Sequence, residues 1–308
     1  MPDVEGAPMI PFVAPLEVDY GTVEQVSPLI QRVVASNPGP FTYTGTGTYI
    51  IGHDRPGASV AVIDPGPLDD RHLAALVQAV AGRRVSHILV THTHRDHAPL
   101  ARPFADRTGG RIMAAQPPVA DTHAGGHLDE DDDADFRPDA ILHGGERMSG
   151  DGWTLEALPT PGHASNHMAF ALIEENALFC GDHVMGWSTT VVAPPDGNMI
   201  AYMASLDAVM ARGFSTLWPT HGGPITDPAP FLIAYRDHRL GREQQIVASL
   251  VTGETRIADL VPVLYARVDE RLWPAASLSV LAHLIKLVVE GRVACDGEPT
   301  MGSLYRLL

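Results

Sequence analysis

Apolar positions in the first part of the chain follow two alternating patterns. Short runs rich in Val, Ile, Tyr and Thr are typical of buried strands, and longer stretches place apolar residues at helical spacing. The strand pattern occurs at 30–35, 42–52, 59–63, 85–90 and 111–115. The helical pattern occurs at 73–80 and 99–108. Strands that alternate with helices in this way predict a layered α/β architecture.

Residues 121–140 interrupt this pattern. The segment contains Gly125, Gly126 and the acidic residues Asp129 and Asp131–Asp133, so we expect a long exposed loop. The second half of the chain then returns to short apolar runs with one helical stretch between them. Its predicted strands are 153–158, 168–173, 177–180 and 216–218, and its predicted helix is 199–211.

Beyond Asp227-Pro228 the pattern becomes mainly helical. Apolar residues at helical spacing predict helices over 230–250, 257–268 and 277–290. The tail, 293–308, has two short strand patterns around a turn at Asp296-Gly297. Two helices followed by a β-hairpin have the outline of a winged-helix module. We therefore expect two domains, residues 1–227 and 228–308.

Composition indicates the cellular compartment expected for this 308-residue chain. The only cysteines, Cys180 and Cys295, cannot form a disulfide framework, which favours a reducing compartment. The first 30 residues lack the basic start and apolar core of a signal peptide. No apolar run approaches the roughly 18 residues that span a bilayer. We expect a cytoplasmic protein without a membrane partner, and no pattern indicates a particular oligomeric state.

The segment that follows the predicted strand 85–90 is rich in metal-binding side chains. Its pattern is His-x-His-x-Asp-His, and its four potential ligands are His92, His94, Asp96 and His97. Three more potential ligands lie in turns beside predicted strands, each with Gly or Pro nearby: His163, Asp182 and His221. Turns at strand ends can direct side chains toward one point. We therefore expect the seven residues to form one metal site at an edge of the sheets.

These residues and their order resemble the metallo-β-lactamase superfamily. The motifs, Asp64, the histidine-rich block, His163, Asp182 and His221, occur in sequence, and the likeness covers about residues 25–225. The resemblance implies an α/β fold, a four-layer αββα sandwich, followed here by a small winged-helix-like domain. The segments Tyr235–Arg239 and Arg242–Gln245 and the helical tail add a closer likeness to the β-lactamase-like protein two group, which includes a single-strand-specific endoribonuclease.

The resemblance also implies a role for each site residue. His92, His94 and His163 would hold one divalent cation, Asp96, His97 and His221 a second, and Asp182 would bridge the two. Asp64 would orient the ligands. Zinc is the first expectation for both ions, with iron or manganese as alternatives. One departure is visible, because Gly45–Thr48 reads Gly-Thr-Gly-Thr where relatives usually have Gly-Thr-Asn-Thr.

The implied chemistry is hydrolysis. Two cations that share a water lower its pKa from 15.7 to about 7 or below, so hydroxide forms at neutral pH and can attack a carbonyl or phosphoryl centre. Asp96 is the candidate catalytic residue, because it could orient the attacking water or pass its proton to the leaving group. The histidines outside the motifs are expected to have no ligand role, with His167 and His183 as candidates for support of the site.

Charge helps to rank the possible functions. The net charge is −16, and the region from Ala229 onward holds nine Lys and Arg residues against nine Asp and Glu residues. This balance provides no basic surface for nucleic acid. We therefore expect a small-molecule ester, thioester or lactone as substrate, and place a single-strand nuclease second. A winged-helix binding protein with a structural metal site ranks third, because structural zinc sites are closed and this site implies an open position.

Overall fold

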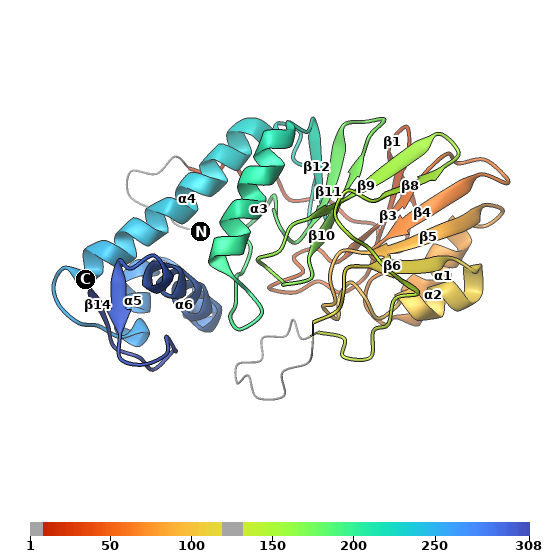
Figure 1. The fold of residues 1–308 in the computed structure, drawn as a ribbon. Helices are drawn as coiled ribbons and strands as arrows, with labels where there is room; N and C mark the ends of the chain where they lie inside the picture. The colour runs from red at the N-terminus through yellow and green to blue at the C-terminus, as the bar shows by residue number, and fades with distance from the viewer. Residues whose placement is uncertain (1–8, 119–131) are drawn as a thin grey trace.

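The computed structural model describes residues 9–118 and 132–308, which form two β-sheets that face each other, with helices on both outer sides (Figure 1). The first sheet has the spatial order β1 to β7: Glu24–Ser27, Ile30–Val34, Gly47–Ile51, Ser59–Ile63, Arg84–Val90, Arg111–Ala114 and Ala140–Ile141. The second sheet has the order β12-β11-β10-β9-β8: Thr216–Pro219, Ala177–Gly181, Met168–Leu172, Trp153–Pro159 and Arg147–Gly150. The pairs β4–β5, β5–β6, β6–β7 and β11–β12 are parallel.

The space between the sheets is filled by large apolar side chains. Tyr49 from β3 packs against Phe179 from β11, with the rings tilted by 53° and their centroids 5.0 Å apart, and its hydroxyl donates to the Pro219 carbonyl at 2.7 Å. Trp153 from β9 donates its indole N–H to the Ser59 carbonyl of β4 at 2.8 Å. Both bonds cross from one sheet to the other. The polar ends of these aromatic residues therefore fix how the two sheets sit relative to each other.

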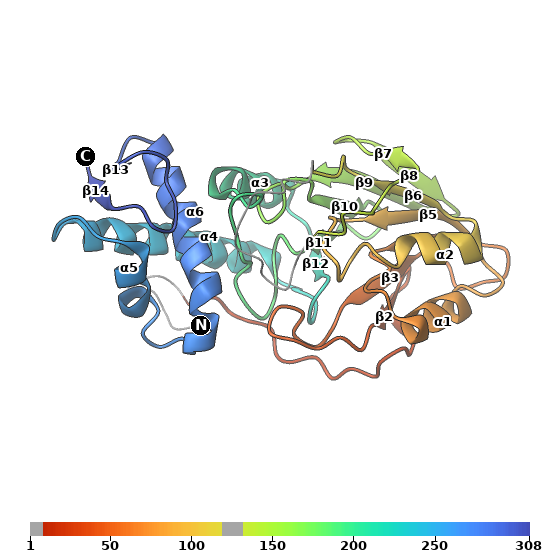
Figure 2. The same cartoon turned by 90° about the horizontal axis from the view of Figure 1, so that it is seen from below.

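The outer layers are helices with one apolar face. On the first sheet lie α1 (Asp70–Ala79), through Leu73 and Leu76, and α2 (Ala101–Thr108), through Phe104. On the second sheet lies α3 (Met199–Arg212), whose buried residues include Tyr202 and Leu206. Figure 2 shows α1 and α2 on the side of the sheets opposite α3. The four-layer αββα sandwich expected from the sequence is confirmed.

The C-terminal region is helical and ends in a small hairpin. Its elements are α4 (Pro228–Leu250), α5 (Ile257–Leu264), the 3₁₀ turn η1 (Glu270–Leu272), α6 (Trp273–Val289), β13 (Val293–Cys295) and β14 (Tyr305–Leu307). The first half of α4 packs into the core under α3 through Phe231 and Tyr235, whereas Ile246 and Leu250 belong to the helical core. One long helix thus contributes to both cores.

One stretch of this region, Glu270–Val289, is long and apolar enough to cross a membrane by length and composition alone. The apolar runs of the sequence did not predict a membrane-spanning stretch here. Several of its apolar side chains, among them Val280, Leu284 and Leu287, pack into the core shared with α4 and α5. Their packing provides a structural reason for the apolar composition of this helix.

The structure changes some of the predicted bounds. The strand expected over 42–52 is limited to β3, because the chain turns at Tyr43, which has a positive φ of 53°. The helix expected over 257–268 ends at Leu264, four residues before the predicted end at Val268. Strands β1, β7 and β8 were not predicted, since β1 and β8 are short and mostly polar and β7 has only two residues. Within the expected loop 121–140, residues 121–131 lie outside the described residues.

The contact of Trp153 with both sheets makes it a test of the sandwich core. Trp153 is 1% exposed. We expect Trp153→Ala to lower the free energy of unfolding by about 3–5 kcal/mol, because it leaves a cavity and an unbonded carbonyl at Ser59. Urea denaturation would measure this change. Val263→Ala, at a position 70% exposed, is the control and should change the value by less than about 0.5 kcal/mol. Equal effects of the two variants would contradict the packing described here.

Candidate metal centre

The structure brings all seven predicted ligands together at one edge of the sandwich. They form three overlapping groups of donor atoms, and within each group the atoms lie within 4.8 Å of one another: His92, His94 and His163; His92, His97 and Asp182; Asp96, His97 and His221. The histidine-rich block directly follows β5, and His163 lies in the turn between β9 and β10. Asp182 and His221 come just after the parallel strands β11 and β12. Strand ends from both sheets therefore supply the site.

The first donor set consists of three imidazoles. The Nδ1 atom of His94 lies 2.9 Å from Nε2 of His92 and 3.2 Å from Nε2 of His163. On the opposite side of the His163 ring, Nδ1 lies 2.7 Å from the Val191 carbonyl oxygen. Because a carbonyl only accepts hydrogen bonds, the His163 proton belongs on Nδ1 and the lone pair of Nε2 faces the other rings.

The second donor set combines imidazoles and carboxylates. The Nε2 atom of His221 lies 3.0 Å from Oδ2 of Asp96 and 3.5 Å from Oδ2 of Asp182. Nε2 of His97 lies 3.4 Å from Oδ2 of Asp96 and 3.5 Å from Oδ1 of Asp182. Asp182 Oδ2 is also 3.8 Å from Nε2 of His163 in the first set. The Asp182 carboxylate thus lies between the two donor sets, where the family resemblance places a bridging ligand.

Asp64 connects the ligands to the framework. Its Oδ1 accepts the backbone N–H of Thr91 at 2.8 Å, and its Oδ2 accepts from the Thr91 hydroxyl at 2.8 Å and the Thr220 hydroxyl at 3.0 Å. Oδ2 also lies 2.8 Å from Nδ1 of His97, so that ring directs Nε2 toward the donor cluster. Thr91 further contacts Nδ1 of His92 at 3.0 Å. These contacts agree with the orienting role expected for Asp64.

Burial keeps His92 and His94 of the first set neutral. Burial and the neighbouring His97 ring lower the pKa of His92 well below its ordinary value. Burial and His163 lower the pKa of His94 to about 3. An imidazole that stays unprotonated at neutral pH keeps a lone pair available for a cation.

In the second set, the imidazoles and carboxylates strongly shift one another's pKa values. Burial lowers the pKa of His221, but Asp182 and Asp96 outweigh it and raise the pKa to about 10. The same two carboxylates, aided by Asp64, overcome burial and raise the pKa of His97. Burial raises the pKa of Asp182, but His221 and His97 hold that pKa well below its ordinary value. The buried Asp182 carboxylate therefore stays ionised, which requires compensating positive charge at this point.

The donor set fits divalent metal ions. Nε2 of His97 and Oδ1 of Asp182 are buried without a hydrogen-bond partner among the described residues. Unsatisfied buried polar atoms are energetically expensive, and here both face the same small volume. A cation bound there would satisfy both. Five imidazoles with two carboxylates form a ligand set that suits zinc and also admits iron or manganese.

The supporting residues were only partly predictable. Nδ1 of His167 contacts the Thr160 hydroxyl at 2.8 Å, and its Nε2 accepts the backbone N–H of Asp182 at 3.1 Å, so it supports the site as expected. His183 is buried against the Tyr202 ring, and neither of its ring nitrogens has a hydrogen-bond partner among the described residues. The carbonyl of Val191 was missed, because no side-chain pattern marks a backbone acceptor.

The sequence departure at Gly47 also has a structural explanation. A Cβ atom at Gly47 would meet the Thr220 carbonyl oxygen at 3.1 Å and Cδ of Arg32 at 3.5 Å. Arg32 is 3% exposed and pairs with Glu24 at 2.6 Å. The space beside the strand end that carries His221 is therefore shared with the Arg32 side chain, which leaves little room for a larger residue at this position.

An αββα sandwich with a His and Asp cluster at the edge shared by both sheets defines a class of metal-dependent hydrolases. Residues 46–221 match the metallo-β-lactamase superfamily, and residues 257–302 match the β-lactamase-associated winged helix domain. The chain belongs to the metallo-β-lactamase superfamily, and it is a hydrolase with a C-terminal winged-helix domain.

Several relatives extend this likeness over most of the chain. A protein of Aspergillus chevalieri named atrochrysone carboxyl ACP thioesterase is 35% identical over 288 residues, which cover 89% of this chain and 85% of that protein. The β-lactamase-like protein 2 homolog of Caenorhabditis elegans is 30% identical over 275 residues, or 88% of each chain. The crystal structure of a β-lactamase domain protein from Burkholderia ambifaria superposes with a TM-score of 0.75 at 20% identity and covers 94% of both chains.

The contacts of Asp64 make its substitution a test of ligand orientation. In Asp64→Asn an amide replaces one carboxylate oxygen, so a donor faces the donors of Thr91 or His97. We expect metal affinity to fall about 10- to 100-fold, as measured by competition with a chromophoric chelator. Asp69→Asn is the matched control, because Asp69 caps α1 and Asn caps a helix equally well. Unchanged affinity in Asp64→Asn would refute the orienting role.

Proposed function

We propose that the protein hydrolyses the carbonyl group of a small thioester or related ester, and that it uses two divalent cations held by the seven clustered residues. The observation that carries this proposal is the convergence of five imidazoles and two carboxylates, with buried donor atoms that have no hydrogen-bond partner among the described residues. The relative named as a thioesterase, which is 35% identical over most of the chain, favours thioesters among the possible carbonyl substrates.

The geometry supports the division of the ligands that the family resemblance implies. His92, His94 and His163 would hold one cation through nitrogens that face each other. Asp96, His97 and His221 would hold the second, with Asp182 between them. When bound, the two cations acidify a water and neutralise the negative charge that develops on the carbonyl oxygen.

The Asp96 side chain is more exposed than those of four other ligands. Its side chain is 17% exposed, against 3% or less for those of His97, His163, Asp182 and His221. Burial raises the pKa of Asp96, but His97 and His221 hold the pKa well below its ordinary value, so the carboxylate stays ionised. An ionised, partly exposed carboxylate at the mouth of the site can accept a hydrogen bond from water and orient it toward the substrate.

The described C-terminal residues argue for a small substrate rather than RNA. Lys286 and Arg292 both pair with Glu243, and Arg306 pairs with Asp296. Cations held in internal ion pairs contribute little to phosphate binding, which depends on the release of counterions around free Lys and Arg. These ion pairs join some of the opposite charges that balance one another in the C-terminal region.

Metal removal tests the proposed reaction. We expect the purified protein to hydrolyse S-octanoyl-N-acetylcysteamine, to lose this activity after treatment with a chelator, and to regain it with zinc, manganese or iron. Free thiol would be measured with a colorimetric reagent. His221→Ala should lose both bound metal and activity, whereas His53→Ala, at an exposed position, should retain both.

A labelled single-stranded RNA would be assayed in parallel with the same protein. RNA cleavage that depends on metal, without hydrolysis of any thioester or ester, would overturn the proposed substrate class. Hydrolysis that survives complete metal removal would overturn the role of the metal centre itself.

A further inference from the structure

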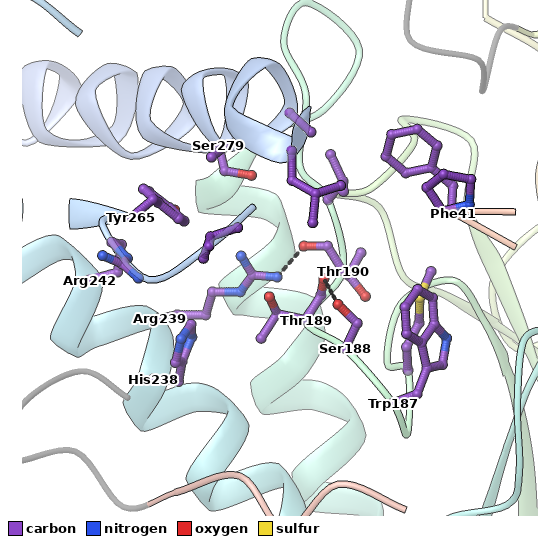
Figure 3. Close-up of a pocket in the computed structure, with 17 residues that line it drawn as sticks. Phe41, Trp187, Ser188, Thr189, Thr190, His238, Arg239, Arg242, Tyr265 and Ser279 are labelled. Atoms are coloured by element: carbon purple, nitrogen blue, oxygen red, sulfur yellow. Dashed lines mark hydrogen bonds between the residues drawn. The ribbon is translucent and has the colours of Figure 1, made fainter. Parts of the chain in front are cut away.

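A pocket lies beside the candidate metal centre, between the segment 185–191 and the helices α4 and α6 (Figure 3). Phe41 and Trp187 lie on one side of it, and Arg239, Arg242 and Tyr265 lie on the other. None of these residues belongs to the proposed ligand set, and the reaction proposed above assigns them no role.

Two buried arginines are the unusual feature of this pocket. Arg239 and Arg242 are each 4% exposed. Among residues 9–118 and 132–308, no carboxylate oxygen lies within 4.0 Å of either guanidinium group. Arg32, whose side chain is also deeply buried, does pair with a carboxylate, that of Glu24. The pocket therefore concentrates positive charge that the described part of the chain does not neutralise.

The existing partners of these arginines are neutral. Arg239 donates Nη2 to the Thr190 carbonyl, and Arg242 donates Nη1 to the Leu264 carbonyl at 2.7 Å and to Oε1 of Gln245 at 2.9 Å. The Nε–H group of each arginine has no partner among the described residues. Carbonyl groups position a guanidinium but do not balance its charge, and buried charges are usually paired.

Aromatic faces hold the two guanidinium groups in place. The Arg242 guanidinium carbon lies 4.1 Å from the Tyr265 ring centroid, and that of Arg239 lies 5.0 Å from the Tyr202 centroid. Such stacking compensates part of the desolvation and leaves the edge of the guanidinium plane open for hydrogen bonds. A planar, positioned guanidinium is the side chain that proteins use to bind carboxylate and phosphate groups.

The remaining lining suits an organic ligand rather than a bare ion. Met185, Val268 and Leu272 line the pocket together with the two aromatic residues on its far side. His238 also lines it, and neither of its ring nitrogens has a partner among the described residues. Burial and the two arginines lower the pKa of His238 to about 3, so the neutral ring can still donate one hydrogen bond. An apolar wall that faces polar and cationic groups matches an apolar molecule with an anionic end.

Short contacts connect this pocket to the metal centre. Val191 lines the pocket, and its carbonyl lies 2.7 Å from Nδ1 of His163. The Thr190 hydroxyl donates to the Asp182 carbonyl at 2.8 Å. Trp187 packs next to Gly222, where an added Cβ would meet the indole at 3.1 Å. A single segment of chain thus contacts both the proposed ligands and the pocket.

We propose that Arg239 and Arg242 form an anion-binding subsite that holds a carboxylate or phosphate group of the substrate while its scissile carbonyl reaches the metal centre. The substrate role rests on the proposed function, whereas anion binding by the pocket does not depend on it. The anion could be a carboxylate on the acyl chain or a phosphate on the thiol part, because both offer the oxygen pair that a guanidinium binds.

Equilibrium binding tests the subsite without catalysis. The probes are decanoate and the neutral decanol, titrated calorimetrically into the full-length, metal-loaded protein. Arg239→Gln should weaken decanoate binding about 10- to 100-fold, the range expected for loss of a charged hydrogen bond, and leave decanol binding within twofold. Arg236→Gln is the matched control, because Arg236 lies on the same helix but pairs with Asp207 near the surface. Unchanged decanoate binding in Arg239→Gln would overturn the subsite, as it would show that the carboxylate binds elsewhere.

Catalysis then identifies which part of the substrate carries the anion. Three thioesters would be compared: octanoyl-N-acetylcysteamine, its analogue with a terminal carboxylate on the acyl chain, and octanoyl-phosphopantetheine. Arg239→Gln should raise KM about tenfold or more for one anionic thioester and change KM and kcat for the neutral one less than twofold. Arg239→Lys should restore part of the difference. An equal loss on all three thioesters would show a purely structural arginine and refute the proposal.

A third variant covers the case in which Arg239→Gln folds poorly. Ser279 lines the pocket and is 8% exposed. Ser279→Asp places a carboxylate there, and we expect it to raise the thermal midpoint and to weaken decanoate binding tenfold or more, with Ser279→Asn as control. A lower midpoint with unchanged decanoate binding would contradict the proposal. If no thioester is hydrolysed but decanoate binds through Arg239, the proposed function fails and the subsite stands.

Discussion

The Asp64 carboxylate is the contact on which the candidate site depends. It follows β4 and accepts hydrogen bonds from Thr91, after β5, and from Thr220, after β12 in the opposite sheet. One buried carboxylate therefore joins strand ends of both sheets at the edge where the ligands lie. It also lies against His97 Nδ1. These contacts fix the carboxylate and the His97 ring relative to the strand ends of both sheets.

The residues that hold the two sheets together are different from those that form the candidate metal site. The large aromatic residues between the sheets determine the spacing of the layers, and the turns after the strands carry polar side chains whose positions depend on few contacts. The two donor sets differ in charge, since the first contains the neutral imidazoles of His92 and His94 and the second contains two ionised carboxylates between imidazoles. Asp182 contacts both sets. A difference in charge within one compact cluster is the arrangement expected where two cations have different ligand environments.

The sequence predicted the fold class and the ligand set because both depend on local patterns. The His-x-His-x-Asp-His block follows a strongly apolar strand, and His163, Asp182 and His221 lie at recognisable turns. The end of α5 was not predictable, since Tyr265 has the apolar character of the helix before it and turns toward Arg242 through a tertiary contact. The net charge of the C-terminal region also did not indicate that two of its arginines are unpaired with any carboxylate of the described residues. Nine cations balance nine anions in the C-terminal region, yet Arg239 and Arg242 have no carboxylate partner there, and only packing shows which charges meet.

The position of α4 explains how the helical region can influence a reaction in the sandwich. Its first half shares a core with α3, and its second half shares one with α5 and α6. Arg239 and Arg242 lie between these two halves and contact the segment 185–191 and Tyr265 respectively. A change in the C-terminal helices would therefore alter the pocket through residues of α4, while the ligands at the strand ends keep their own contacts. This geometry allows substrate preference to vary through the helices and the metal chemistry to stay with the strands.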